Sequence, residues 1–125
     1  MNLSYNLFLD DIRDPLQCVS YMKNPIYENL EWVIVRSYDE FVEMISKNGL
    51  PEVISFDHDL STDDAIASSF GEPLTEKTGF DCARWLTEYL LDTNLTCPYF
   101  LVHSMNPTGK VNIESLLYNF NRFIM

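Results

Sequence analysis

Short apolar runs alternate with amphipathic helical patterns along this chain of 125 residues. The apolar runs, rich in β-branched and aromatic residues, predict strands at 5–11, 31–37, 52–60 and 98–104. Between and after them, the pattern predicts one or two helical turns at 16–24 and longer helices at 37–49, at 78–94 and from Ile113 to Ile124. Strands that alternate with helices pair in parallel, so we expect an α/β fold with three layers, a small parallel sheet between helices.

The predicted strand order is 2-1-3-4, as in flavodoxin-like folds, because right-handed crossovers place the first and third strands side by side. The carboxyl ends of these two strands then flank the topological switch point, where ligands of such folds bind. We expect residues 1–125 to form a single domain, because a chain of this length supports one hydrophobic core and shows no repeat or linker.

Capping residues locate the ends of two helices. Ser37, with Glu40 three residues later, predicts the start of the helix over 37–49, which Gly49 then ends. The stretch MNPTGKVN has the composition of a turn. We therefore expect the last helix to begin after it, with Asn112 as its N-cap.

The composition limits the partners that the chain can have. A formal net charge of −11 argues against the binding of long nucleic acid. No apolar run approaches the roughly 20 residues of a membrane-spanning helix, and the first residues lack the basic stretch of a signal peptide. The three cysteines form no C-x-x-C pair, which is typical of reduced thiols. We expect a cytoplasmic protein, whose acidic residues serve solubility or hold a cation.

Acidic residues and histidines follow three of the predicted strands at their carboxyl ends. They are Asp10 and Asp11 after the first strand, Asp57, His58 and Asp59 after the third, and His103 and Ser104 after the fourth. Converging carboxylates repel one another, and a hard divalent cation relieves that repulsion through oxygen ligands. We therefore expect these four aspartates to hold a divalent cation, Mg²⁺ or Mn²⁺ rather than Zn²⁺. The histidines would be acid/base groups or ligands to a softer metal.

The segment after the fourth strand offers groups that bind phosphate. Ser104, Asn106, Gly109 and Lys110 lie just ahead of the predicted last helix, whose free amides and dipole favour an anion. Lys110 would add a point charge. The mixed composition of residues 61–77 predicts a long loop, and loops of this length often close over a site.

Each of these residues also has a structural explanation when it is taken alone. Asp10 and Asp11 fit a turn or a cap, His103 fits a half-buried hydrogen-bonded residue, and Lys110 fits a solvated surface position. The segment ISFDHDLS also fits the D-x-D start of haloacid-dehalogenase-type phosphatases, but there the motif follows the first strand of a longer chain. The functional interpretation rests on the predicted convergence of the strand ends.

The arrangement resembles the phosphoacceptor site of response-regulator receiver domains. In those domains a pair of acids after the first strand and an aspartate after the third hold Mg²⁺, and a Ser or Thr ends the fourth. Asp10, Asp11, Asp57 and Ser104 match these positions. The chain has no clear fifth strand with the receiver lysine, since Lys110 lies in another segment. Attack by water is therefore favoured over a covalent phospho-Asp57.

A closer resemblance extends over nearly the whole chain. The segments LFLDDIRDP, ISFDHDL, TGFDCARWL and VHSMNPTGKVNI resemble the motifs of cyclic-phosphate processing receiver domains. This resemblance implies a phosphate-handling site for cyclic phosphates, such as 2′,3′-cyclic ends of RNA or cyclic nucleotides. Members of the family occur in bacteria and in phages, so a phage-encoded member would act in the host cytoplasm.

The expected function is metal-dependent hydrolysis of a cyclic phosphodiester, with Asp57, His58 and His103 as the catalytic residues. The alternative is a module that binds or sequesters a cyclic nucleotide or another phosphorylated signal without turnover. A third interpretation is a structural or protein-interaction role, with the acids as a solvated rim. The first two imply a small phosphorylated ligand as partner and leave the oligomeric state open.

Overall fold

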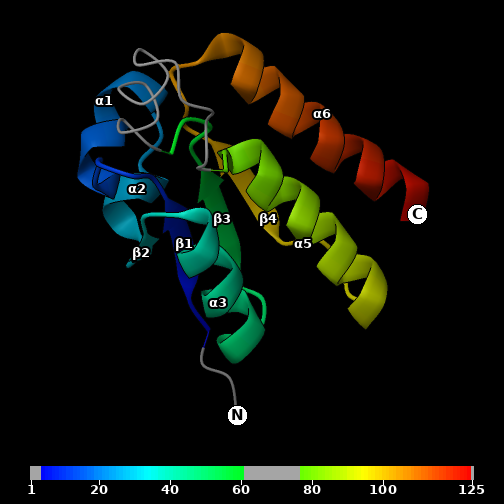
Figure 1. The fold of residues 1–125 in the computed structure, drawn as a ribbon. Helices are drawn as coiled ribbons and strands as arrows, with labels where there is room; N and C mark the ends of the chain where they lie inside the picture. The colour runs from blue at the N-terminus through cyan, green and yellow to red at the C-terminus, as the bar shows by residue number, and fades with distance from the viewer. Residues whose placement is uncertain (1–3, 61–76, 125) are drawn as a thin grey trace, which may run out of the picture.

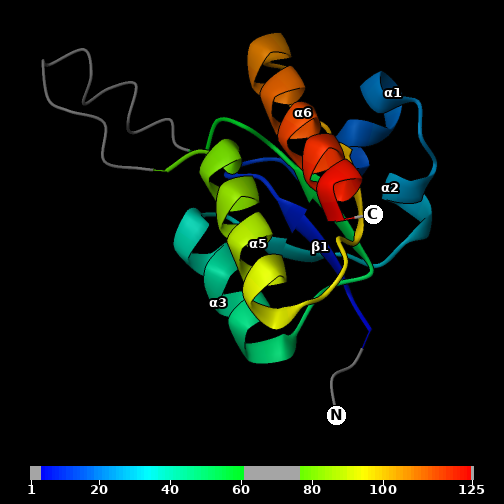
Figure 2. The same ribbon diagram turned by 90° about the vertical axis from the view of Figure 1, so that its right-hand side faces the viewer.

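A four-stranded parallel sheet forms the centre of the computed structural model, which describes residues 4–60 and 77–124. The strand order is β2-β1-β3-β4 (Figure 1), as predicted. The strands are β1 (Asn6–Leu9), β2 (Val33–Val35), β3 (Val53–Phe56) and β4 (Tyr99–Val102). Helical segments lie on both sides of the sheet (Figure 2), so the expected α/β fold with three layers is confirmed.

The strands end before the polar residues that follow the apolar runs. One further backbone bond continues the ladder at each junction: Asp57 N donates to Leu9 O and His103 N donates to Phe56 O, both at 2.9 Å. These bonds extend the parallel register of β1, β3 and β4. Asp10, Asp57 and His103 therefore lie in a row across the carboxyl edge of the sheet.

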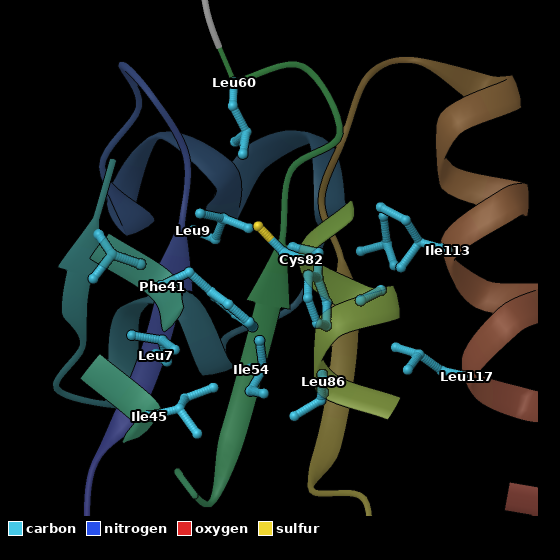
Figure 3. Packing of buried hydrophobic residues seen from close by; sticks show 14 of the residues in the cluster. Leu7, Leu9, Phe41, Ile45, Ile54, Leu60, Cys82, Leu86, Ile113 and Leu117 are labelled. Atoms are coloured by element: carbon cyan, nitrogen blue, oxygen red, sulfur yellow. The ribbon is translucent and has the colours of Figure 1, made fainter. Parts of the chain in front are cut away.

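The larger core lies on one face of the sheet. Three helices pack there: α3 (Tyr38–Asn48), α5 (Gly79–Thr93) and α6 (Pro107–Ile124). Their apolar stripes meet the strand residues that point to this face (Figure 3), including Leu7, Leu9 and Ile54. Full burial of such a side chain contributes about 1.5–3 kcal/mol. Cys82 of α5 is fully buried in the same cluster.

Short helical turns cover the opposite face. They are η1 (Pro15–Cys18) and α1 (Val19–Met22), as predicted for 16–24, and α2 (Ile26–Asn29), which was not predicted. Beneath them, Phe8, Cys18 and Tyr27 form a second buried cluster. Phe8 of β1 thus packs away from its neighbours Leu7 and Leu9, as strand alternation requires.

Helix α6 begins at Pro107, inside the stretch that was predicted to be a turn. The prediction that Asn112 caps this helix is therefore wrong. Asn106 supplies the capping contact instead, because its Oδ1 accepts a hydrogen bond from Gly109 N at 3.0 Å. Pro107 is tolerated in the first turn, where its missing N–H leaves no bond unmade.

The predicted start of α3 is confirmed. Ser37 Oγ accepts a hydrogen bond from Glu40 N at 3.2 Å. The Glu40 carboxylate accepts from Arg36 N at 2.9 Å, one residue before the position that a reciprocal capping box uses. Gly49 ends the helix with a φ of 82°, a left-handed value that favours glycine.

Helix α5 begins directly against the end of β3. Gly79 N donates to His58 O at 2.7 Å, and a side chain at position 79 would overlap the carbonyl oxygen of Asp57. Thr78 and Asp81 form a reciprocal capping box at this start. The close contact holds the backbone that carries Asp57 and His58 against a helix.

Residues 61–76, most of the predicted loop over 61–77, lie outside the described residues. Within the described ranges, no helix is long and apolar enough to cross a membrane.

Candidate functional site

A cleft of about 380 Å³ opens at the carboxyl edge of the sheet, between the segments that follow β1, β3 and β4. Its described lining residues are Asp11, Ile12, Arg13, Asp57, Asp59, Ser104, Met105, Asn106 and Pro107. Three segments that are far apart in the sequence thus meet at the topological switch point, where ligands of such sheets bind.

Asp10 lies behind this cleft as a fully buried carboxylate. Its Oδ1 accepts hydrogen bonds from Ile12 N and Arg13 N, each at 2.9 Å. Its Oδ2 lies 3.0 Å from His103 Nε2. Burial alone would raise the pKa of Asp10, but the hydrogen bonds from His103 and the two amides outweigh it and lower that pKa to about 2. Asp10 is therefore an anion at neutral pH.

A chain of buried polar groups continues from Asp10 through His103. His103 Nδ1 lies 2.7 Å from Ser55 Oγ, which lies 2.7 Å from Tyr27 Oη. Because ionised Asp10 can only accept, His103 Nε2–H donates to it. Burial lowers the pKa of His103, so the neutral ring accepts at Nδ1 from the Ser55 hydroxyl. The Tyr27 hydroxyl then donates to Ser55, and every donor in the chain has a partner.

His103 therefore occupies a different place from the one predicted for an acid/base residue. Its side chain has no exposed surface, and both ring nitrogens bond protein groups. The ring also stacks on Phe8, with centroids 4.4 Å apart and an interplanar angle of 6°. In this position His103 fixes the orientation and charge of Asp10 and does not line the cleft.

The carboxyl groups of Asp57 and Asp11 line the cleft, and the pKa of each is raised. Asp57 is 4% exposed, and its Oδ1 accepts a hydrogen bond from His58 N at 2.9 Å. Burial, followed by repulsion from Asp10, raises the pKa of Asp57 to about 6. The same two causes raise the pKa of Asp11. This is the repulsion expected from converging carboxylates, and oxygen donors of this kind fit a hard divalent cation.

Three of the potential ligand atoms lie close enough for one ion. Asp10, Asp57 and His103 each offer an atom within 4.8 Å of the other two. The atoms of Asp10 and His103 already bond each other, however. Asp57 is the member of this group that also lines the cleft, and the Asp11 carboxylate lines the same cleft.

His58 lies beside the cleft rather than in its wall. Its Nδ1 is 2.9 Å from Asp59 Oδ1; the His58 side chain is 19% exposed and that of Asp59 is 67% exposed. The ring packs against α6 at Gly109, where a Cβ atom would overlap it. Asp59 lines the cleft and His58 does not. The two predicted acid/base residues are therefore not brought together.

Two of the four predicted phosphate-binding residues line the cleft. Ser104 and Asn106 do so, and Ser104 Oγ accepts a hydrogen bond from Asn106 N at 3.1 Å. Gly109 and Lys110 lie in the first turn of α6 instead, because that helix begins earlier than predicted. Their amides donate to Asn106 Oδ1 and Asn106 O at 3.0 and 2.9 Å. These two amides are therefore not free for a ligand.

Arg13 also lines the cleft, and the sequence interpretation gave it no role. Its backbone amide bonds Asp10 Oδ1, and its guanidinium Nη1 lies 3.6 Å from Asp10 Oδ2. Its place in the segment LFLDDIRDP, three residues after a strand-end aspartate, is the signal in the sequence that could have identified it.

The parallel sheet with this strand order, the acids after β1 and β3 and the hydroxyl residue after β4 define a receiver-like α/β domain. The family model for the cyclic-phosphate processing receiver domain matches residues 5–119. The chain belongs to this family, which confirms the resemblance seen in its motifs. No curated protein and no solved structure matches the chain. The name of the family implies a role in the processing of cyclic phosphates.

Proposed function

We propose that this protein hydrolyses a cyclic phosphodiester in a reaction that depends on a divalent cation. The observation that carries the proposal is the pair of cleft-lining acids Asp11 and Asp57, whose pKa values are both raised by burial and by Asp10. Such a pair favours the binding of a cation, and a bound cation favours an anionic ligand. We take the anionic ligand to be a cyclic phosphate because the chain belongs to the family of cyclic-phosphate processing receiver domains.

Asp11 and Asp57 would hold the cation, with Asp10 fixed behind them and Asp59 at the exposed rim as a further ligand. Mg²⁺ or Mn²⁺ fits this set better than Zn²⁺, because the facing donors are carboxylate oxygens and His103 already bonds Asp10. When bound, the cation would supply charge neutralisation and polarise a phosphoryl oxygen.

The residues of the chain would bind the phosphate and move protons. Ser104 and Asn106 line the cleft and would donate hydrogen bonds to phosphate oxygens. In the hydrolysis a water oxygen would bond to phosphorus and give one proton to a base, one ester P–O bond would break, and the leaving oxygen would take up a proton from that base or from solvent. Asp59, which lies at the rim with His58 Nδ1 2.9 Å from its Oδ1, would accept the proton of the water.

A second candidate function is a module that binds a cyclic nucleotide or another phosphorylated signal without turnover. One observation favours it: neither of the two histidines lines the cleft. The ligand-binding residues would be the same in this case. The two functions differ only in what happens to the ligand after it binds.

Product analysis separates the two functions. The full chain is incubated with 2′,3′-cyclic nucleotides and with cyclic di- and trinucleotides, with Mg²⁺ or Mn²⁺, and the nucleotides are identified by mass spectrometry. The proposal expects a ring-opened phosphomonoester in at least one reaction, and its loss in Asp11→Asn and Asp57→Asn. Asp92→Asn, an exposed acid on α5, is the matched control and should retain activity. A bound but unaltered ligand would establish the binding module instead.

A further inference from the structure

We propose that Arg13 is the residue that recognises the phosphate, and that Tyr21 and Asp10 hold its guanidinium in the wall of the cleft. The inference rests on the proposed site for a cyclic phosphodiester and adds to it the residue that binds the anion. It assigns to Arg13 the cationic role that the sequence had suggested for Lys110.

The position of Arg13 gives the first part of the argument. Among the described residues that line the cleft, Arg13 is the one that carries a positive charge, next to the acids Asp11, Asp57 and Asp59. Its side chain is 24% exposed, so it is neither buried nor free in solvent. Lys110 does not line the cleft.

The guanidinium is held from two sides. Nη1 donates a hydrogen bond to Tyr21 Oη at 3.1 Å and lies 3.6 Å from Asp10 Oδ2. The guanidinium carbon also lies 5.7 Å from the centre of the Tyr21 ring, in a cation–π arrangement. Both polar contacts use Nη1, and an arginine has five N–H donors. Among the described residues, the donors on Nη2 and Nε have no protein partner, so they are offered to a ligand.

Tyr21 is itself anchored to the end of β4. Its hydroxyl donates to His103 O at 2.7 Å and contacts Cys18 Sγ at 3.1 Å. A tyrosine that receives a hydrogen bond from Arg13 while it donates to the strand end fixes the guanidinium relative to the sheet. Such an arrangement reduces the rotamer entropy that a free arginine would lose on binding a ligand.

The backbone of Arg13 is fixed as well. Arg36 Nη1 donates to Arg13 O at 2.6 Å and to Asp10 O at 3.2 Å. Its Nη2 pairs with Asp14 at 2.8 Å. Arg36 thus fixes the backbone of the segment after β1, while the Arg13 side chain lines the cleft.

The charges of the cleft explain why an arginine is suited to this position. Asp10, Asp11, Asp57 and Asp59 against Arg13 leave three negative charges in excess, and a divalent cation would balance two of them. A phosphodiester then meets a cleft whose excess negative charge is largely balanced and which holds one fixed guanidinium. Its two non-bridging oxygens match the planar fork of arginine, which a lysine cannot offer.

The main rival is a purely structural role, in which Arg13 neutralises Asp10 and nothing more. Binding measurements on the full chain, with saturating Mg²⁺, separate the two. The probes are inorganic phosphate and 2′,3′-cyclic AMP, titrated by calorimetry. We expect Arg13→Gln to raise the Kd for both probes by about tenfold or more, without weakening the binding of Mg²⁺. Arg84→Gln, an exposed arginine on α5, is the control and should leave the Kd unchanged.

Two more variants test the geometry and cover the case in which Arg13→Gln does not fold. Arg13→Lys keeps the charge but loses the fork, and it should weaken binding of both probes severalfold. Tyr21→Phe removes the hydroxyl that holds Nη1, and it should weaken binding less than Arg13→Lys. Equal affinity of wild type and Arg13→Lys would overturn the proposal, as would a wild type that binds neither probe.

Turnover separates this inference from the proposed function. If the wild type binds cyclic AMP in a manner that depends on Arg13 but never opens the ring, hydrolysis is refuted and the role of Arg13 stands. If the ring is opened and Arg13→Gln has the KM of the wild type, the role of Arg13 is refuted and hydrolysis stands. A rise in KM larger than the fall in kcat is the result that we expect.

Discussion

Nε2 of His103 lies 3.0 Å from Oδ2 of Asp10, and neither side chain has any surface exposed to solvent. This contact joins the ends of β1 and β4 across β3, which lies between them in the sheet. It gives Asp10 a hydrogen-bond donor in place of water, so that the acid stays charged inside the protein. His103 thus acts on the site through Asp10, without lining the cleft itself.

The contact predicts that the two histidines differ in their contribution to stability. His103→Gln cannot reproduce both ring bonds and leaves buried Asp10 underpaired, so it should lower the free energy of unfolding by about 2–4 kcal/mol. His58→Gln is the matched control, since its pair with Asp59 is partly exposed, and it should cost under about 1 kcal/mol. Urea unfolding measures both. Equal losses would contradict the role given to His103.

The buried chain behind His103 predicts an effect for a residue that does not line the cleft. Ser55→Ala leaves both His103 Nδ1 and the Tyr27 hydroxyl without their partner, and should cost about 1–3 kcal/mol. Ser115→Ala, at an exposed position on α6, should change stability by less than about 0.5 kcal/mol. Thermal or urea unfolding compares the two variants. A neutral Ser55→Ala would show that the chain is not a connected network.

The raised pKa of Asp57 predicts how stability depends on pH in the absence of divalent cations. This carboxyl has a pKa of about 6 in the folded state, whereas its usual value is 3.8. Between pH 3.8 and about pH 6 the folded state therefore binds more protons than the unfolded state. Stability is therefore lost as the pH rises through this window. The free energy of unfolding of Asp57→Asn should exceed that of the wild type by about 2 kcal/mol at pH 7, and the difference should disappear toward pH 4.

Two comparisons check this prediction. Asp92→Asn should follow the wild type at every pH, and excess Mg²⁺ should stabilise the wild type but not Asp57→Asn. Urea unfolding at several pH values, with and without Mg²⁺, gives all the required free energies. A variant at position 57 that is less stable than the wild type at pH 7 without cations would contradict the account.

The strand ends were predictable from the sequence because they follow from local pattern and general topology. Apolar runs gave β1, β3 and β4, right-handed crossovers gave their order, and the order brought Asp57 and Ser104 to one edge. The start of α6 was not predictable in the same way. Asn-Pro-Thr-Gly has turn composition, but Asn106 and Pro107 also suit the cap and first turn of a helix, and tertiary packing at Gly109 decides between them.

The roles of individual side chains depended on partners that are distant in the sequence. His103 was expected to face a ligand, whereas Ser55, which is 48 residues away, holds its second nitrogen. Arg13 was missed because an arginine is by default a solvated surface residue. Only the fold shows that Tyr21 and Asp10 hold it in the wall of the cleft.

The central claim is that water opens a cyclic phosphodiester in this cleft with the help of a divalent cation. Incubation of the full chain with 2′,3′-cyclic AMP in ¹⁸O-labelled water, with Mg²⁺ or with chelator, tests it directly by mass spectrometry and ³¹P NMR. We expect a phosphomonoester with one ¹⁸O on phosphorus when Mg²⁺ is present, none with chelator, and none with Asp57→Asn. Ring opening that is equally fast with chelator, or in Asp57→Asn with Mg²⁺, would contradict the claim.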